Sequence, residues 1–309
     1  MYAWIGFGFA CFILFSGNVS GQALIASRSE EGIEITDKGK KVLFFQARPK
    51  SLNGKYERAG YIHPLYGLNE KSITEDMPED HPHHHGIFWG WHQIIWKGKP
   101  IADGWSYENI SWEPVKLILK KRKENIAIHS EMNWKVKLQN GHQMNAVKEK
   151  VIIRVFKSAV QYRIIDFDIR LNALVDDLEI GGSDNVWGYG GFSLRLNVPD
   201  DISFAWDDKK LTPRDSGVLA PWINFMGSFE GKSLPGNGVA VFPKPLDSGA
   251  PSSWIINANP SMQNVRYPGR IPVALSRKGL RLRYRVIIHD GSLDDETLKN
   301  LYAEYLLVP

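Results

Sequence analysis

The sequence has almost no cysteine. Cys11 is the single cysteine among 309 residues, and it lies inside an apolar N-terminal stretch. A lone cysteine cannot form an internal disulfide or a cysteine-rich metal site, so both are excluded for this chain.

A strong excess of charge is also missing. The chain has 38 Lys and Arg residues against 34 Asp and Glu residues, which gives a formal net charge of +4. This mild basic balance suits an acidic small molecule or polymer, and it is too weak to indicate nucleic-acid binding. We therefore expect no nucleic-acid partner.

No apolar run is long enough to cross a bilayer. The stretch from Trp4 to Phe15 has about 12 residues, whereas a membrane-spanning helix needs about 20. Residues 1–21 contain no charged side chain and end in small and polar residues, which is typical of a secretory signal peptide. We predict cleavage after this segment, a periplasmic or secreted mature chain, and no stable membrane insertion afterwards; an uncleaved anchor is the alternative.

The remaining chain, residues 22–309, is predicted to be one all-β domain. Short segments rich in β-branched and aromatic residues alternate with Gly, Pro, Asn and Asp, and no linker or repeat divides them. We expect a large antiparallel β-sandwich, of the mutarotase-like kind, with a C-terminal helix that starts at Ser292 and packs on a sheet edge. In residues 150–156 and 281–286 polar and apolar side chains alternate, so each strand should bury one face. The predicted strands are 42–46, 126–134, 149–156, 162–171, 187–197, 239–242, 254–258 and 279–289.

Histidine is concentrated in one short part of the chain. Six of the nine histidines fall between His63 and His92, and the segment from Asp80 to His85 alone contains four of them. Imidazole takes up and returns protons near neutral pH, and neutral histidine is also a common metal ligand. The spacing favours neither use: proton transfer and a divalent metal held by His81, His83, His85 and Asp80 stay open.

Aromatic and basic residues near and beyond this segment are further candidates. Trp89 and Trp91 follow the histidines directly, and indole rings can stack on sugar rings, although core packing is the alternative. The glycine-rich stretch 181–191 leads to Tyr189 and Arg195 and is predicted to be a bulged strand with tight turns. Arg266 lies in a compact basic turn, and His289 ends the last predicted strand.

Four motifs, in order along the chain, resemble a bacterial family labelled PmoA-like. They are residues 58–66 (Arg58-x-x-Tyr-x-His63-Pro-Leu-Tyr66), 80–91 with the Asp-His-Pro-His-His block, 189–195, and 283–291. The family's name refers to a methane oxygenase, but this chain lacks the multiple membrane spans of such a subunit. Members look like exported proteins that accompany glycan-degrading enzymes, so the resemblance implies an oligosaccharide substrate.

We therefore expect a carbon–oxygen lyase or dehydratase that acts on uronic-acid-containing oligosaccharides. Elimination beside a carboxylate needs a base, an acid for the departing oxygen, and a positive group for the enolate-like charge. The predicted base is His83 or His84 and the predicted acid is Tyr189 or His63. Arg58 or Arg195 should hold the carboxylate, with further substrate contacts from Tyr66, Trp89, Trp91, Arg266 and His289. A glycoside hydrolase with paired carboxylates and a sugar-binding module without catalysis are the alternatives.

Overall fold

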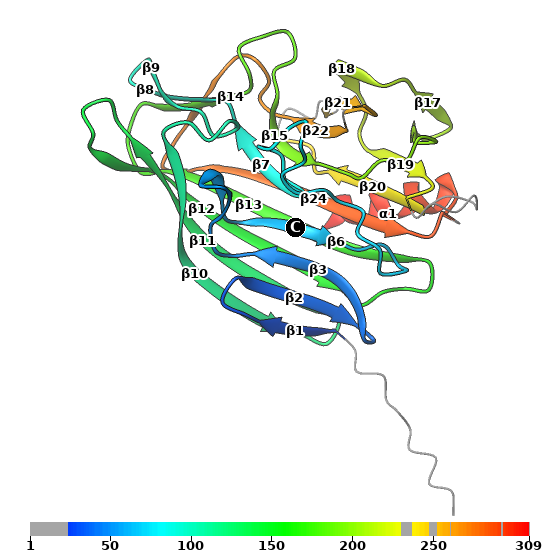
Figure 1. Cartoon of the computed structure of the whole chain (residues 1–309). Coiled ribbons are helices and arrows are strands. Elements are labelled where there is room, and N and C mark those ends of the chain that lie inside the picture. Colours follow the sequence, from blue (N-terminus) through cyan, green and yellow to red (C-terminus); the bar gives the residue numbers. More distant parts are fainter. Residues whose placement is uncertain (1–23, 230–236, 247–251, 260, 292, 309) are drawn as a thin grey trace, which may run out of the picture.

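The computed structural model describes residues 24–229, 237–246, 252–259, 261–291 and 293–308 (Figure 1). The predicted signal peptide and Ser292, the predicted helix start, lie outside these ranges. Within them, no helix is long and apolar enough to cross a membrane.

Two nine-stranded antiparallel sheets form the two layers of the fold (Figure 1). The all-β sandwich with a C-terminal helix is therefore confirmed. In spatial order, the first sheet contains β1 (Ile25–Arg28), β2 (Gly32–Asp37), β3 (Lys40–Gln46), β6 (Tyr61–Leu65), β7 (Ile87–Trp91), β15 (Gly190–Leu194), β22 (Met262–Arg266), β21 (Ser253–Asn257) and β18 (Arg214–Leu219). The second sheet contains β10 (Ile110–Lys121), β11 (Asn125–Lys137), β12 (Gln143–Phe156), β13 (Tyr162–Ala173), β24 (Leu280–His289), β20 (Asn237–Pro243), β19 (Ile223–Gly227), β16 (Ser203–Trp206) and β17 (Lys209–Leu211).

Two smaller sheets complete the strand inventory of the described residues. One is four-stranded, in the order β23 (Val273–Leu275), β14 (Leu178–Gly181), β8 (Gln93–Trp96) and β9 (Lys99–Ala102). The other is the hairpin of β4 (Lys50–Leu52) and β5 (Lys55–Arg58), which ends beside the start of β6.

The core lies between the two large sheets, as the alternating pattern predicts. Val151, Ile153 and Val155 of β12 are buried, so the predicted alternation in this strand is confirmed. The ring of Phe192 on β15 stacks on Tyr284 of β24, with 4.2 Å between ring centroids, which joins the two layers. Each such buried side chain stabilises the fold by about 1.5–3 kcal/mol relative to its exposed state.

The helix α1 (Asp295–Leu307) packs on a sheet face and not on a sheet edge. Its N-cap is Asp294, whose side chain accepts a hydrogen bond from the amide of Thr297. Leu298 and Leu301 contact a cluster that includes Phe242 of β20 and Ile287 of β24. Both strands are interior to the second sheet, and Phe242 and Ile287 are apolar residues on its outward face. They need a cover, so the predicted edge packing is wrong.

The alternation along β7 determines which side chains reach the outer face of the first sheet. Trp89 and Trp91 point into the core between the sheets, whereas Phe88 belongs to a separate outer cluster with Tyr61 and Trp105. This outer face carries the histidine segment.

Candidate functional site

Arg195 fastens the histidine segment to the outer face of the first sheet. It follows β15 and is 4% exposed. Its Nη2 donates to both carboxylate oxygens of Asp80 at 2.7 and 2.8 Å, and its Nε donates to Glu75 at 2.8 Å. Its Nη1 donates to the carbonyl of Ser261 at 2.7 Å. Burial raises the pKa of Asp80, but the hydrogen bonds from Arg195 and His81 outweigh it and lower the pKa to about 2.

Four histidines gather on this face, two of them in contact with the indole ring of Trp105. His81 stacks on His84 with 4.7 Å between centroids, and His83 lies 4.4 Å from His84. His84 and His92 lie 5.8 and 5.5 Å from the ring of Trp105. We call these four histidines with Trp105 the histidine face.

His92 forms a histidine–carboxylate pair within this face. Its Nδ1 lies 2.8 Å from Oδ2 of Asp103. The other oxygen of Asp103 accepts hydrogen bonds from the amides of Trp105 and Ser106 at 2.8 and 2.9 Å. Burial raises the pKa of Asp103, but these hydrogen bonds outweigh it and lower the pKa, so the carboxylate stays ionised. When Nδ1–H donates to Asp103, Nε2 of His92 is left as the proton acceptor.

The surroundings of His83 keep its imidazole neutral at physiological pH. Burial and the neighbouring imidazoles of His81 and His92 lower the pKa of His83 to about 4. Burial also lowers the pKa of His84. His83 is only partly buried, and the ring of Tyr56 lies 6.3 Å from it. A neutral, partly exposed imidazole has a free lone pair and can accept a proton from a bound substrate.

Tyr189 also contacts the Trp105 indole, although it comes from a distant part of the sequence. The backbone at Gly182 and Gly188 crosses so closely that a Cβ at Gly182 would lie 2.2 Å from the Gly188 carbonyl oxygen. This crossing ends in Tyr189, whose amide donates to the Ser183 hydroxyl at 2.9 Å. The Tyr189 ring lies 5.7 Å from that of Trp105. The glycines thus permit the turn that presents the phenol.

A second polar group lies deeper, around Asp76. Asp76 accepts from Nδ1 of His85 at 2.6 Å, from the Tyr61 hydroxyl at 3.2 Å and from Nζ of Lys50 at 2.7 Å. Burial raises the pKa of Asp76, but the hydrogen bonds from His85 and Lys50 outweigh it and lower the pKa. Burial lowers the pKa of the fully enclosed His85 and, together with Asp76, raises that of Tyr61. Within the described chain, Nε2 of His85 has no hydrogen-bond partner.

The structure brings several predicted site residues together. His81, His83, His84 and Tyr189 share the histidine face, and Asp80 lies beside His81 at 3.0 Å. His63 lies apart, with Nδ1 at 3.1 Å from the Thr74 hydroxyl, and burial lowers its pKa to about 4.

Other predicted contacts lie elsewhere. His289 is buried in the second sheet, where Nε2 lies 3.0 Å from Oδ1 of Asn224 and Nδ1 accepts from the Gly291 amide. Trp89 and Trp91 are fully buried in the core, so these two predictions of sugar stacking are wrong. The reason is the register of β7, which turns both indoles inward.

Protein groups engage the predicted arginine and tyrosine contacts, and of these only Arg195 borders the histidine face. Arg58 is buried, donates to the Trp89 carbonyl at 2.5 Å and lies 4.3 Å above the Trp112 ring. Arg266 donates to the Ser253 hydroxyl and the Trp187 carbonyl, and Tyr66 lies under Lys41. Arg195 already donates hydrogen bonds to the carboxylates of Glu75 and Asp80. This geometry favours positioning roles for Arg58 and Arg195 over a direct hold on a substrate carboxylate.

The predicted metal ligands do not form a chelating set. Among the residues that the structure describes, no group of three or more His, Cys, Asp or Glu side chains is arranged to hold a metal ion. His85 is turned inward to Asp76, while Asp80 is bound by Arg195. The arrangement therefore does not support the divalent ion that the sequence left open at His81, His83, His85 and Asp80.

The sequence predicted no role for His92, Asp103 or Tyr56. His92 and Asp103 are separated by the hairpin of β8 and β9, so their spacing carries no local pattern. The sequence Asp103-Gly104 marks a turn, and a carboxylate at a turn beside the histidine cluster was the one available signal.

The buried histidines predict a loss of stability in acid. Burial lowers the pKa of His63, His83 and His289 from 6.5 to about 4. Between these values the unfolded chain binds more protons than the folded protein, so the free energy of unfolding falls as pH drops from about 6.5 to about 4. The fully buried His289 alone accounts for about 3 kcal/mol of this fall.

Urea unfolding at pH 7.5, 5.5 and 4 measures the effect. His289→Gln should reduce the drop in unfolding free energy between pH 7.5 and 4. His142→Gln, at an exposed turn position, should leave this drop unchanged. An unfolding free energy that is constant across this window contradicts the assignment of neutral buried imidazoles.

Comparison with known proteins gives a family without a described activity. None of the curated proteins matches the chain. A family model described as "Family of unknown function (DUF6807)" matches residues 32–303, which include the histidine face and every strand of the two large sheets except β1. The chain belongs to this family of unknown function, DUF6807.

Proposed function

We propose that this protein is an exported enzyme that catalyses elimination on uronic-acid-containing oligosaccharides, as a lyase or dehydratase. One observation carries the proposal: the His92–Asp103 pair and the Tyr189 phenol lie around the Trp105 indole, and a neutral His83 packs on His84 beside the same indole. Acid–base catalysis needs groups of this kind within reach of one substrate.

In the proposed reaction, His83 removes the proton from the carbon that bears the substrate carboxylate. The electron pair forms a C=C bond as the C–O bond at the neighbouring carbon breaks. The departing oxygen takes a proton from Tyr189 or from the imidazolium of His92. When His92 carries a proton, the adjacent Asp103 carboxylate balances its charge.

The choice of an acidic sugar has two supports. The chain has a net charge of +4, which favours an anionic substrate. The motifs at residues 58–66, 80–91, 189–195 and 283–291 resemble the PmoA-like family, whose members accompany glycan-degrading enzymes. Export to the periplasm or secretion from the cell is part of the same proposal, because the enzyme would encounter its oligosaccharide substrates there.

The test is a panel of saturated and unsaturated oligouronates incubated with the protein. Product mass and the absorbance of the new C=C bond are followed together. Loss of one water indicates a dehydratase, and chain cleavage with a rise in absorbance indicates a lyase. Products heavier by one water, or unchanged substrates across the panel, contradict elimination.

A glycoside hydrolase is the second candidate, because two carboxylates share one cavity. Glu75 and Asp80 both bind Arg195 at the wall of a polar cavity of about 360 Å³, and both side chains are partly exposed. Paired carboxylates are the machinery of most glycosidases. In that case Glu75→Gln or Asp80→Asn abolishes turnover and the products gain water.

A further inference from the structure

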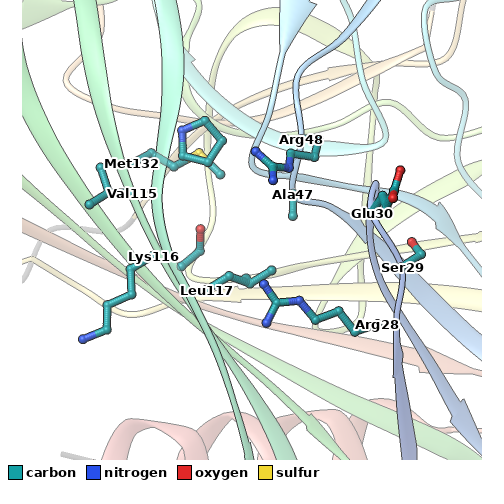
Figure 2. A pocket seen from close by; sticks show the side chains of 11 residues that line it. Arg28, Ser29, Glu30, Ala47, Arg48, Val115, Lys116, Leu117 and Met132 are labelled. Carbon is teal, nitrogen blue, oxygen red and sulfur yellow. The ribbon is translucent and has the colours of Figure 1, made fainter.

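A second cavity opens between the two sheets, away from the histidine face. It has a volume of about 610 Å³, which is in the range of small-molecule sites. Its walls come from the β1–β2 turn and the end of β3 on one side, and from β10 and β11 on the other (Figure 2). Both β1 and β10 are edge strands of their sheets, so the cavity lies where the sandwich is open.

Two exposed arginines form one rim of this cavity. Arg28 and Arg48 are exposed, and across the described ranges no hydrogen bond or ion pair engages either guanidinium. The amides of Ala47 and Arg48 both donate to the Glu31 carbonyl, at 2.9 and 3.0 Å, which holds the two rim segments together. In Figure 2 both guanidinium groups extend from their strands toward the side on which Leu117 lies.

The opposite wall is apolar and is exposed by a β-bulge. The pairing of β10 with β11 shifts between Pro114 and Lys116, which leaves Val115 without a cross-strand partner and 50% exposed. Leu117 and the buried Met132 continue this wall inward. The cavity therefore combines an apolar wall with a cationic rim, where Lys116 adds a positive charge and Glu30 a negative one.

We propose that this cavity binds a carboxylate ligand that has an apolar face. The carboxylate lies between the guanidinium groups of Arg28 and Arg48, whose planar forks match carboxylate geometry. The apolar face lies on Val115 and Leu117. An acidic saccharide, with the C–H face of its ring, and a fatty acid share this chemistry. The proposal does not depend on the reaction at the histidine face.

Isothermal titration of the full mature protein tests the proposal with three probes: trigalacturonate, decanoate and neutral maltotriose. We expect one of the two carboxylates to bind, with an affinity that falls at least about 10-fold in Arg28→Gln/Arg48→Gln because both charge-assisted contacts are lost. The carboxylate that binds identifies the source of the ligand. Added salt should weaken binding because the rim is exposed.

Arg122→Gln/Lys123→Gln is the matched control. This control also removes two positive charges, but from an exposed turn between β10 and β11, so it should leave the affinity unchanged. Equal loss in both double variants, equal binding of maltotriose, or no binding of either carboxylate overturns the proposal. Because binding is measured without turnover, a failure of the proposed elimination does not change the outcome.

Discussion

His83→Ala is expected to lower kcat on an oligouronate by about 10²–10⁴-fold, the usual contribution of a positioned general base. The imidazole is neutral near pH 7 because burial and the neighbouring histidines lower its pKa to about 4. In the wild-type protein kcat should therefore hold as pH falls from 7 to 5 and then decline as His83 takes up a proton near pH 4. Steady-state kinetics across this range measures both effects.

The control for this variant is His142→Ala. His142 is exposed in the turn between β11 and β12, so the same substitution removes an imidazole that is not part of the histidine face and should leave kcat unchanged. If His83→Ala keeps full activity and an unaltered pH profile, His83 is not the base. His83 is partly exposed, so its loss should not unfold the protein.

Asp76→Ala is expected to destabilise the fold by about 3–5 kcal/mol, the cost of breaking a buried charge network. The carboxylate side chain is 4% exposed and His85 is fully buried, so the variant leaves His85 Nδ1 and the Tyr61 hydroxyl without their acceptor. Lys50 adds little, because its side chain is 48% exposed. Asp76→Asn, which retains an acceptor oxygen, should cost less.

Urea unfolding at pH 7 compares these variants with Asp176→Ala. Asp176 forms an exposed pair with Arg277, and its loss should leave the unfolding free energy unchanged. The lowered pKa of Asp76 means that its contribution is present above the unfolded-state value near 4 and is lost as pH falls below it. Equal effects of Asp76→Ala and Asp176→Ala contradict the role of Asp76 as a buried acceptor.

The fold was predictable where burial follows a local period. In β12, Val151, Ile153 and Val155 alternate with polar residues, and that pattern alone indicates a strand with one buried face. The position of α1 was not predictable in this way. It depends on Phe242 and Ile287, which are apolar on the outward face of two different strands, and only their pairing in the sheet shows that they need a cover.

The candidate site was likewise predictable from the sequence only in part. The density of histidine in the sequence pointed to His83 and His84, and the structure places both on the outer face with Tyr189. The roles of Trp89, Trp91 and Arg195 depended on facts that the sequence does not contain. The register of β7 decides which indoles face the core, and the long-range pairing of Arg195 with Asp80 uses its donors within the protein.

Incubation of an oligouronate in ¹⁸O-labelled water tests most directly whether the histidine face breaks a C–O bond by elimination. Elimination takes no oxygen from water, so we expect an unsaturated product that gains no label when the bond breaks. A lyase gives fragments whose summed mass equals that of the substrate, and a dehydratase gives a product lighter by one water. Hydrolysis adds one water per bond broken. Products that carry one ¹⁸O atom, with no new C=C absorbance, would contradict elimination at the histidine face.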